Sequence, residues 1–125
     1  MLGTKDAIAT IAVKNIAVAK PFYQDTLGLT PVPIPEKSVL AFKSGNSSVL
    51  VYESQFAGTN KATAATWAVG DDVAGVVKAL KAKGVKFKQY DMPGTRREGD
   101  VHVMGTTKTA WCEDPDGNIL ALVNG

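Results

Sequence analysis

Few side chains in this sequence could carry out acid–base or nucleophilic chemistry, and most of them lie near the C-terminal end. The 125 residues include one histidine, His102, and one cysteine, Cys112. Glu98 and Asp100 lie close to His102 in the sequence, and an imidazole beside carboxylates can transfer protons. The simpler alternative is a polar loop edge. If His102 has a functional role, we favour contact with a ligand over catalysis.

The single thiol is the other candidate for chemistry. Cys112 would be a nucleophile only if a nearby base or cation deprotonated it. It lies between Trp111 and Glu113 in an expected strand, which favours a small core residue. The sequence has no glycine-rich phosphate loop, no Ser-His-Asp set and no C-x-x-C pair. We therefore expect no catalytic residue and no thiol cluster that could hold zinc.

The composition is typical of one compact domain with an apolar core. Hydrophobic residues make up 45% of the chain, charged residues 21%, and the net charge is +2, which argues against disorder. The densest basic stretch, 81–88, straddles an expected helix end, where cations complement the helix dipole. We expect no nucleic-acid partner. The apolar run 7–13 is too short to span a membrane and no signal peptide is visible, so we expect a cytoplasmic protein with no membrane partner.

An internal repeat organises the elements that must position these residues. Ala9-Thr10-Ile11-Ala12-Val13 recurs as Ala65-Thr66-Trp67-Ala68-Val69, identical at four of five positions with an offset of 56. At the same offset Gly28 falls on Gly84, and Asn15 falls on Asp71. A strand, a helix start and a helix stop thus recur in register. The chain is interpreted as one domain made of two copies of a unit, about residues 1–58 and 59–125.

Each copy is expected to contain a strand, a helix and three shorter strands. Asn15 and Asp71, or a polar neighbour of each, can cap the helices, and Gly28 and Gly84 can end them. Pro21 is compatible with the first helix only near its first turn. Residues 91–105 are expected to form one long loop that carries His102. The strand 30–34 is at best an edge strand, because Pro31 and Pro33 cannot donate to a ladder. The expected strands are 7–13, 30–34, 38–44 and 48–53 in the first copy, and 63–69, 85–90, 106–113 and 118–123 in the second.

Two motifs carry a resemblance to a known family. Residues 22–29, Phe-Tyr-Gln-Asp-Thr-Leu-Gly-Leu, resemble its "FY…vLGL" opening, and residues 114–118, Asp-Pro-Asp-Gly-Asn, resemble its "DPDGN" closing hairpin. The sequence resembles the vicinal oxygen chelate superfamily, which includes glyoxalase I, bleomycin-resistance proteins and extradiol dioxygenases. The resemblance covers nearly the whole chain. It implies an α+β fold of two tandem βαβββ modules with curved mixed sheets forming a cup.

The resemblance also implies where a metal ion would be held in the family's metalloenzymes. The first-strand position falls at Ile8 and its repeat at Ala64, and the last-strand positions fall at Ala121 and at Val51 or Tyr52. Zinc, iron or manganese sites need imidazole, carboxylate or thiolate ligands, and these residues supply none. We therefore expect no metal and no other cofactor.

The remaining possibility from the resemblance is a cup that binds a ligand by shape. Strand alternation places residues of the same parity as the family's ligand positions inside the cup and the others, such as Trp67, under the helices. A roomy, mostly apolar cup suits an organic molecule. An equally weighted alternative is that the small residues only allow the sheets to pack closely and that no ligand binds. The candidate ligand contacts are Thr10, Tyr52, Thr66, His102, Trp111 and Ala121.

The sequence therefore favours a small-molecule-binding protein of this superfamily that uses no metal. Its partner would be a hydrophobic or aromatic organic compound, sequestered in a way that could give drug tolerance. The resemblance implies a homodimer. The alternative function is a lyase-like or isomerase-like enzyme acting on a small carbonyl compound, and a purely structural module is a third class.

Overall fold

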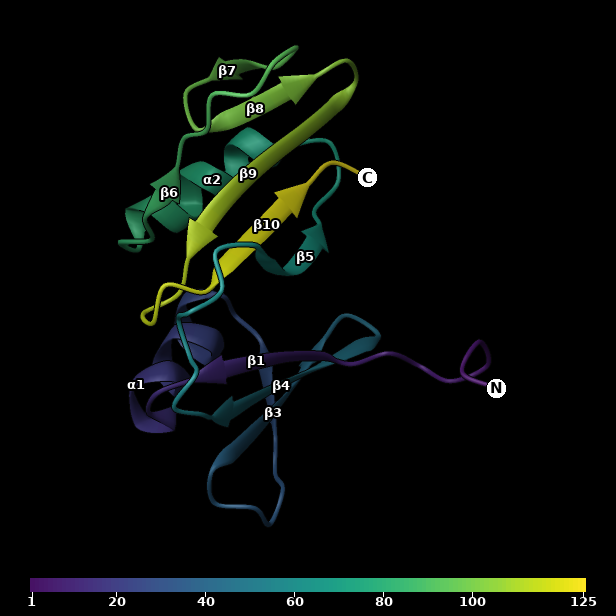
Figure 1. Ribbon diagram of the computed structural model, residues 1–125, viewed down its shortest axis with the longest axis vertical. Helices are drawn as coiled ribbons and strands as arrows, with labels where there is room; N and C mark the ends of the chain where they lie inside the picture. The colour runs from purple at the N-terminus through teal and green to yellow at the C-terminus, as the bar shows by residue number, and fades with distance from the viewer. The chain divides into compact units, whose positions relative to one another are not determined.

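The computed structural model describes residues 1–125, and the chain falls into two compact units, Met1–Gly58 and Thr59–Gly125. Each unit has a mixed β-sheet and one helical segment (Figure 1). This confirms the α+β fold class with two mixed sheets. Neither unit contains a helix that could span a membrane.

The first unit is a four-stranded sheet in the order β1-β4-β3-β2. Strands β1 and β4 are parallel and the other neighbours are antiparallel. Strand β2 lies at the edge, as Pro31 predicts, since proline cannot donate to a ladder. The elements are β1 Ala9–Val13, α1 Ile16–Pro21, the π-helical turn η1 Phe22–Thr26, β2 Thr30–Val32, β3 Val39–Ser44 and β4 Ser47–Glu53.

The helix of the first unit begins earlier relative to Pro21 than the sequence analysis expected. Asn15 caps it by accepting a hydrogen bond from the Ala17 N–H at 2.8 Å, and this cap sets the start at Ile16. Pro21 is therefore the last residue of α1 and not part of its first turn. Because proline lacks an N–H, the regular ladder is interrupted there. The chain continues in a wider turn, in which Leu27 N–H donates to the Phe22 carbonyl at 2.9 Å.

The second unit has a sheet in the order β5-β10-β9-β8-β7, with β6 also paired to β9. Strands β5 and β10 are parallel, which repeats the relation between β1 and β4. Asp72, the neighbour of Asp71, caps the helix by accepting from the Gly75 N–H at 2.9 Å. The elements are β5 Thr63–Ala68, α2 Val73–Ala82, β6 Phe87–Lys88, β7 Arg96–Glu98, β8 Val101–Met104, β9 Thr107–Glu113 and β10 Ile119–Val123.

The prediction of one long loop over residues 91–105 was wrong. Residues 96–104 form the β7–β8 hairpin, and His102 lies in the middle of β8. The signal was the alternation Val101-His102-Val103, in which both valines are buried against the core. Gly99, with φ of +64°, makes the turn between the two strands. A buried strand so short is easily overlooked among the charged residues around it.

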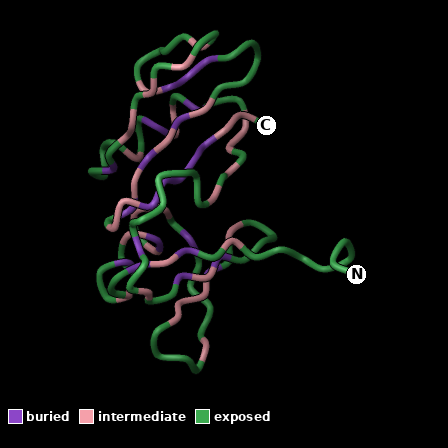
Figure 2. The backbone as a smooth tube through the Cα atoms, in the orientation of Figure 1, coloured by how far each residue is buried: buried purple, intermediate pink, exposed green.

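The core of the second unit lies between α2 and one face of its sheet. Val73 and Val77 of α2 pack with Val101, Ala110 and Leu122, and Trp67 packs against this cluster, as predicted. Figure 1 shows α2 along this sheet, and Figure 2 shows buried positions recurring along β8, β9 and β10. The other face of the sheet, called here the helix-free face, carries the residues that alternate with these.

The closing turn of residues 114–118 is held by one buried carboxylate. Asp114 accepts hydrogen bonds from the backbone N–H groups of Asp116 and Asn118 at 2.9 and 2.8 Å. It also accepts from the Asn118 side-chain amide at 2.8 Å. Gly117 adopts φ of +85°, a conformation that glycine favours. The turn fixes the register of β9 against β10, because it joins their ends.

We predict that Asp114→Ala lowers the free energy of unfolding by about 3 kcal/mol, since it removes a charged acceptor and leaves buried donors without partners. Urea denaturation measures this loss. The control is Pro115→Ala, at an exposed position of the same turn, which we expect to cost less than about 1 kcal/mol. Equal losses in the two variants would contradict this role of Asp114.

Candidate functional site

Four of the six predicted ligand contacts share the helix-free face of the second sheet. In the strand register Ala121 lies opposite both Thr66 of β5 and Trp111 of β9. His102 of β8 lies opposite Thr109, two residues before Trp111 on β9. Because directly paired residues point to the same side of a sheet, these side chains form one surface across four strands. Their role in ligand binding stays a prediction.

A small pocket lies on this face, with a volume of about 130 Å³. Its wall contains the Trp111 ring, the His102 ring, two thioethers and three threonines, and it has no charged side chain. The lining residues are Met92, Thr95, His102, Met104, Thr107, Thr109 and Trp111. An apolar hollow with a few polar atoms is the usual form of a small-molecule site.

His102 is the most constrained residue of the pocket. It is only 2% exposed, and its Nε2 accepts a hydrogen bond from the Tyr90 backbone N–H at 2.9 Å. A ring nitrogen that accepts carries no hydrogen, so the neutral ring holds its proton on Nδ1. That Nδ1 is buried and has no hydrogen-bond partner.

Three aromatic rings hold this arrangement. The His102 and Trp111 centroids are 4.9 Å apart at 77°, and those of Tyr90 and Trp111 are 5.3 Å apart at 85°. Such edge-to-face contacts are favourable. The Trp111 indole N–H also donates to the Thr63 hydroxyl at 3.2 Å. The Trp111 ring is thus fixed at its edges while it contributes to the pocket wall.

A second polar atom of the same pocket is buried without a partner, the hydroxyl of Thr95. Buried polar groups are nearly always hydrogen-bonded, and leaving one unpaired costs about 1–3 kcal/mol. Both His102 and Thr95 contribute to the pocket wall, while these two atoms themselves are enclosed by protein. The sequence analysis did not identify Thr95, because it lies in the segment that was expected to be a loop.

The first sheet settles the register that the sequence left open. Ile11 pairs with Val51, and both are fully buried in the core. Tyr52, which is 38% exposed, therefore points to the opposite face, as does Thr10. Thr10 pairs with Leu50, so Leu50 is the counterpart of Ala121, and neither Val51 nor Tyr52 is. Of the six predicted contacts, only His102 and Trp111 line the pocket described above. Ligand contacts by the other four, Thr10, Tyr52, Thr66 and Ala121, stay a prediction.

The donor set does not fit the metal that the resemblance implies for metalloenzymes. The positions concerned are Ile8, Ala64 and Ala121, together with Leu50 by the register just given. None has a side chain that can donate an electron pair to a cation. No group of three or more His, Cys, Asp or Glu side chains is arranged to hold an ion.

Several charged side chains of the second unit are engaged with one another. Lys88 Nζ lies 2.6 Å from Glu113 Oε1, and this hydrogen bond raises the pKa of Lys88. Lys81 Nζ lies 2.7 Å from Asp100 Oδ2, and this hydrogen bond lowers the pKa of Asp100 against the opposing effect of its burial. Arg97 pairs with Asp91 at 3.8 Å and donates to Gln89.

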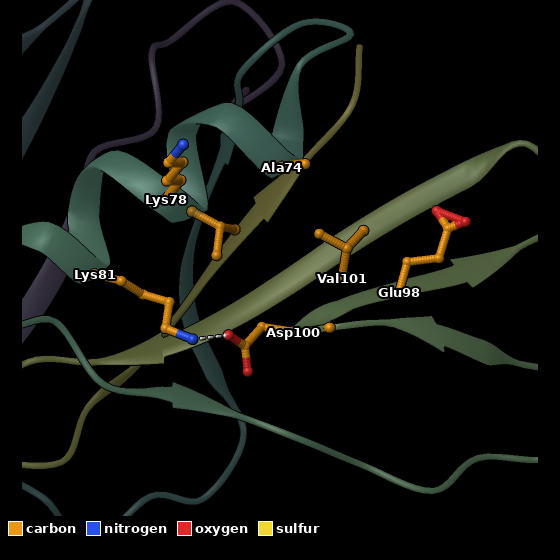
Figure 3. Close-up of a pocket in the computed structure, with 8 residues that line it drawn as sticks. Ala74, Lys78, Lys81, Glu98, Asp100 and Val101 are labelled. Carbon is orange, nitrogen blue, oxygen red and sulfur yellow. Dashed lines mark hydrogen bonds and ion pairs between the residues drawn. The ribbon is translucent and has the colours of Figure 1, made fainter.

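A larger hollow of about 360 Å³ lies between α2 and the β7–β8 turn (Figure 3). The Lys81–Asp100 ion pair lies within it, whereas the Lys78 ammonium points away from Asp100. No buried polar atom of this hollow lacks a partner. Asp100 is paired with Lys81 and Glu98 with Arg96 without a ligand, so we place the candidate site in the smaller pocket.

The two mixed sheets and their helices define the class of protein. This arrangement is the α+β glyoxalase-like fold. The model of the Glyoxalase/Bleomycin resistance protein/Dioxygenase superfamily matches residues 6–122. The chain belongs to this superfamily, as the two sequence motifs predicted. A comparison with curated proteins found no significant match.

Similar solved structures carry different names within this fold. A lactoylglutathione lyase from Agrobacterium tumefaciens is 16% identical, with 100% of this chain and 96% of that one covered and a TM-score of 0.72. The fosfomycin resistance protein FosX from Listeria monocytogenes is 17% identical, with 98% and 93% covered and a TM-score of 0.74. A glyoxalase family protein from Enterococcus faecalis is 19% identical, with 99% and 100% covered and a TM-score of 0.74. At these identities the likeness establishes the fold alone.

Cys112 is a core residue, as the sequence predicted. It is 1% exposed and points to the face of β9 opposite Trp111. Burial raises the pKa of its thiol to about 12, and the charges of Asp114 and Glu113 add to the effect. The nucleophilic thiolate is thus suppressed at neutral pH.

We predict that Cys112 in the native protein reacts with a thiol reagent such as 5,5′-dithiobis(2-nitrobenzoate) at pH 8 at least about a hundredfold more slowly than in urea-unfolded protein. The release of thionitrobenzoate measures both rates. Rapid labelling of the native protein would show that the thiol is accessible and ionised, against this assignment.

Proposed function

We propose that this protein binds a small organic molecule in the pocket of its second unit, without a metal ion. One observation carries the proposal: the helix-free face holds a pocket whose wall combines the Trp111 and His102 rings with two methionines and three threonines and contains no charged side chain. An organic occupant would cover the Trp111 ring, which is only partly buried.

The wall of the pocket supports binding by shape and hydrogen bonding. With no ionic group in the wall, contact with Trp111, Met92 and Met104 would supply most of the affinity. Thioethers adapt to ligands of varied outline. Sequestration of a hydrophobic or aromatic compound fits such a wall, and it is a route to drug tolerance. We further propose a homodimer located in the cytoplasm, with neither a nucleic-acid nor a membrane partner.

We predict that a thermal-shift screen of neutral organic compounds finds ligands that raise the unfolding midpoint, because a ligand specific for the folded state stabilises it by mass action. Trp111→Ala should abolish the shift, since it removes the largest surface of the pocket. The matched control is Lys78→Ala, in the larger hollow, which should keep the full shift.

The same screen can contradict the proposal in two ways. No ligand from a broad panel would leave the pocket without a binding role. Ligands whose shift survives Trp111→Ala but is lost in Lys78→Ala would move the site to the hollow beside α2.

A second candidate is a lyase-like or isomerase-like enzyme that acts on a small carbonyl compound. The observation that favours it is the position of His102, the one titratable side chain in the pocket wall, since an imidazole can act as a general acid or base. The name of the Agrobacterium neighbour, a lactoylglutathione lyase, is in the same class.

Because the site lacks a second acid–base group, we predict no turnover of the hemithioacetal of methylglyoxal and glutathione above the uncatalysed rate. Absorbance of the thioester product measures it, with a metal chelator present and absent. Turnover in the presence of chelator that is lost in His102→Ala would favour the enzyme over the binding protein.

A further inference from the structure

We propose that the first unit has a separate binding site, a groove that takes an organic monocarboxylate with an apolar chain. The site does not depend on the pocket beside Trp111. Three observations carry the inference: an accessible apolar groove where the pairing of β2 with β3 ends, one unpaired cation in its wall, and the absence of an acidic side chain from that wall.

The groove arises where a proline ends the pairing of two strands. The β2–β3 ladder stops at Val32, opposite Ala41. Pro33 follows and has no N–H to donate, so β2 cannot continue in regular pairing. Strand β3 nevertheless extends to Val39, where it is paired with β4 on its other side. One side of β3 is therefore left without a neighbouring strand.

The direction of the backbone groups at Val39 confirms that this edge is open. The Ser38 carbonyl accepts a hydrogen bond from the Glu53 N–H of β4 at 3.0 Å. Successive residues of a strand direct their backbone groups to opposite sides. Those of Val39 therefore point away from β4, to the side where β2 has ended, and no strand pairs with them there.

The wall of the groove is apolar, and much of it can be reached from solvent. The hollow has a volume of about 350 Å³, and its wall consists of eight apolar residues and Lys20. Phe42 is buried at 1% exposure, whereas Val32 is 43% exposed. Pro31 and Pro33 are exposed as well. An exposed apolar surface in a concave position is typical of a ligand-binding groove.

Lys20 gives this groove a positive charge. It is exposed, lies next to the end of α1, and forms no ion pair, in contrast to Lys81 and Lys88 of the second unit. Its ammonium complements the C-terminal end of the helix, but this role does not account for the apolar wall beside it. No acidic side chain lines the groove. A ligand with one carboxylate and a hydrocarbon chain complements both features.

The experiment compares octanoate with octylammonium, two ions of similar length and opposite charge. Titrations of the ¹⁵N-labelled protein are followed by the amide resonances of Val39 and Leu40. We expect octanoate to bind about fivefold more tightly than octylammonium, since one ion is attracted and the other repelled by an exposed cation.

A change of chain length tests the apolar part of the groove. A fully buried CH₂ group contributes about fourfold to an affinity. Because the groove is open and buries a chain only in part, we expect octanoate to bind at least about tenfold more tightly than butyrate. Binding that does not depend on chain length would overturn the inference.

Two pairs of variants assign the binding to the groove. Lys20→Gln should remove the preference for octanoate over octylammonium. Lys43→Gln, the same change of charge at an exposed lysine outside the wall, should keep it. Val32→Ser should weaken octanoate about threefold, whereas Val18→Ser, at an exposed valine of α1 outside the wall, should not. All four positions are exposed, so we expect unchanged unfolding midpoints.

The outcomes separate this inference from the proposed function. Equal binding of the two ions, or a preference that survives Lys20→Gln, would overturn the inference. Shifts confined to the amides of β8 and β9 would also overturn it, and they would support the pocket beside Trp111 instead. Octanoate binding at Val39 that is retained in Trp111→Ala would support a separate site, whatever the fate of the proposed function.

Discussion

The hydrogen bond from the Tyr90 N–H to His102 Nε2 is the interaction on which the candidate site depends. It occupies one ring nitrogen and thereby fixes the hydrogen of the neutral ring on the other. The His102 ring also packs against the rings of Tyr90 and Trp111, and its Nδ1 is enclosed by protein. This single backbone contact therefore sets the orientation of an aromatic ring that lines the pocket.

The two-fold alternation of strands accounts for the rest of the arrangement. On β8, Val101 and Val103 turn to α2, so His102 must turn to the opposite face. On β9, Ala110 and Cys112 fill the core while Thr109 and Trp111 face the pocket. The burial that stabilises the core therefore also places the aromatic and hydroxyl groups on the helix-free face. A one-residue shift in register would exchange the two sets, and the Asp114 turn opposes such a shift.

Much of the fold could be predicted from the sequence because its signals are local. The repeat of Ala9–Val13 in 65–69, the glycines at 28 and 84 and the Asp-Pro-Asp-Gly turn each depend on short-range chemistry. The β7–β8 hairpin was missed because its strands are short and the residues between Asp91 and Asp100 are mostly charged or turn-forming. The Pro21 position was misjudged because the Asn15 cap, and not the proline, sets where the helix begins.

The candidate site was predictable only in part, for a related physical reason. Parity along single strands put Trp111, Thr66 and Ala121 on one face, and the structure agrees on that face. Thr95 and Met92 reach the pocket from outside the regular strands, so no periodicity points to them. The partners of His102 depend on strand pairing between distant residues, which a sequence does not show.

The state of the one histidine tests this account most directly. A long-range ¹H–¹⁵N correlation spectrum of ¹⁵N-labelled protein without ligand at pH 7 shows a single imidazole, because His102 is the only histidine. The account predicts that the ring hydrogen lies on Nδ1 and that Nε2 accepts the hydrogen bond from the Tyr90 N–H. A ring protonated at Nε2, or one averaging between both nitrogens, would contradict it.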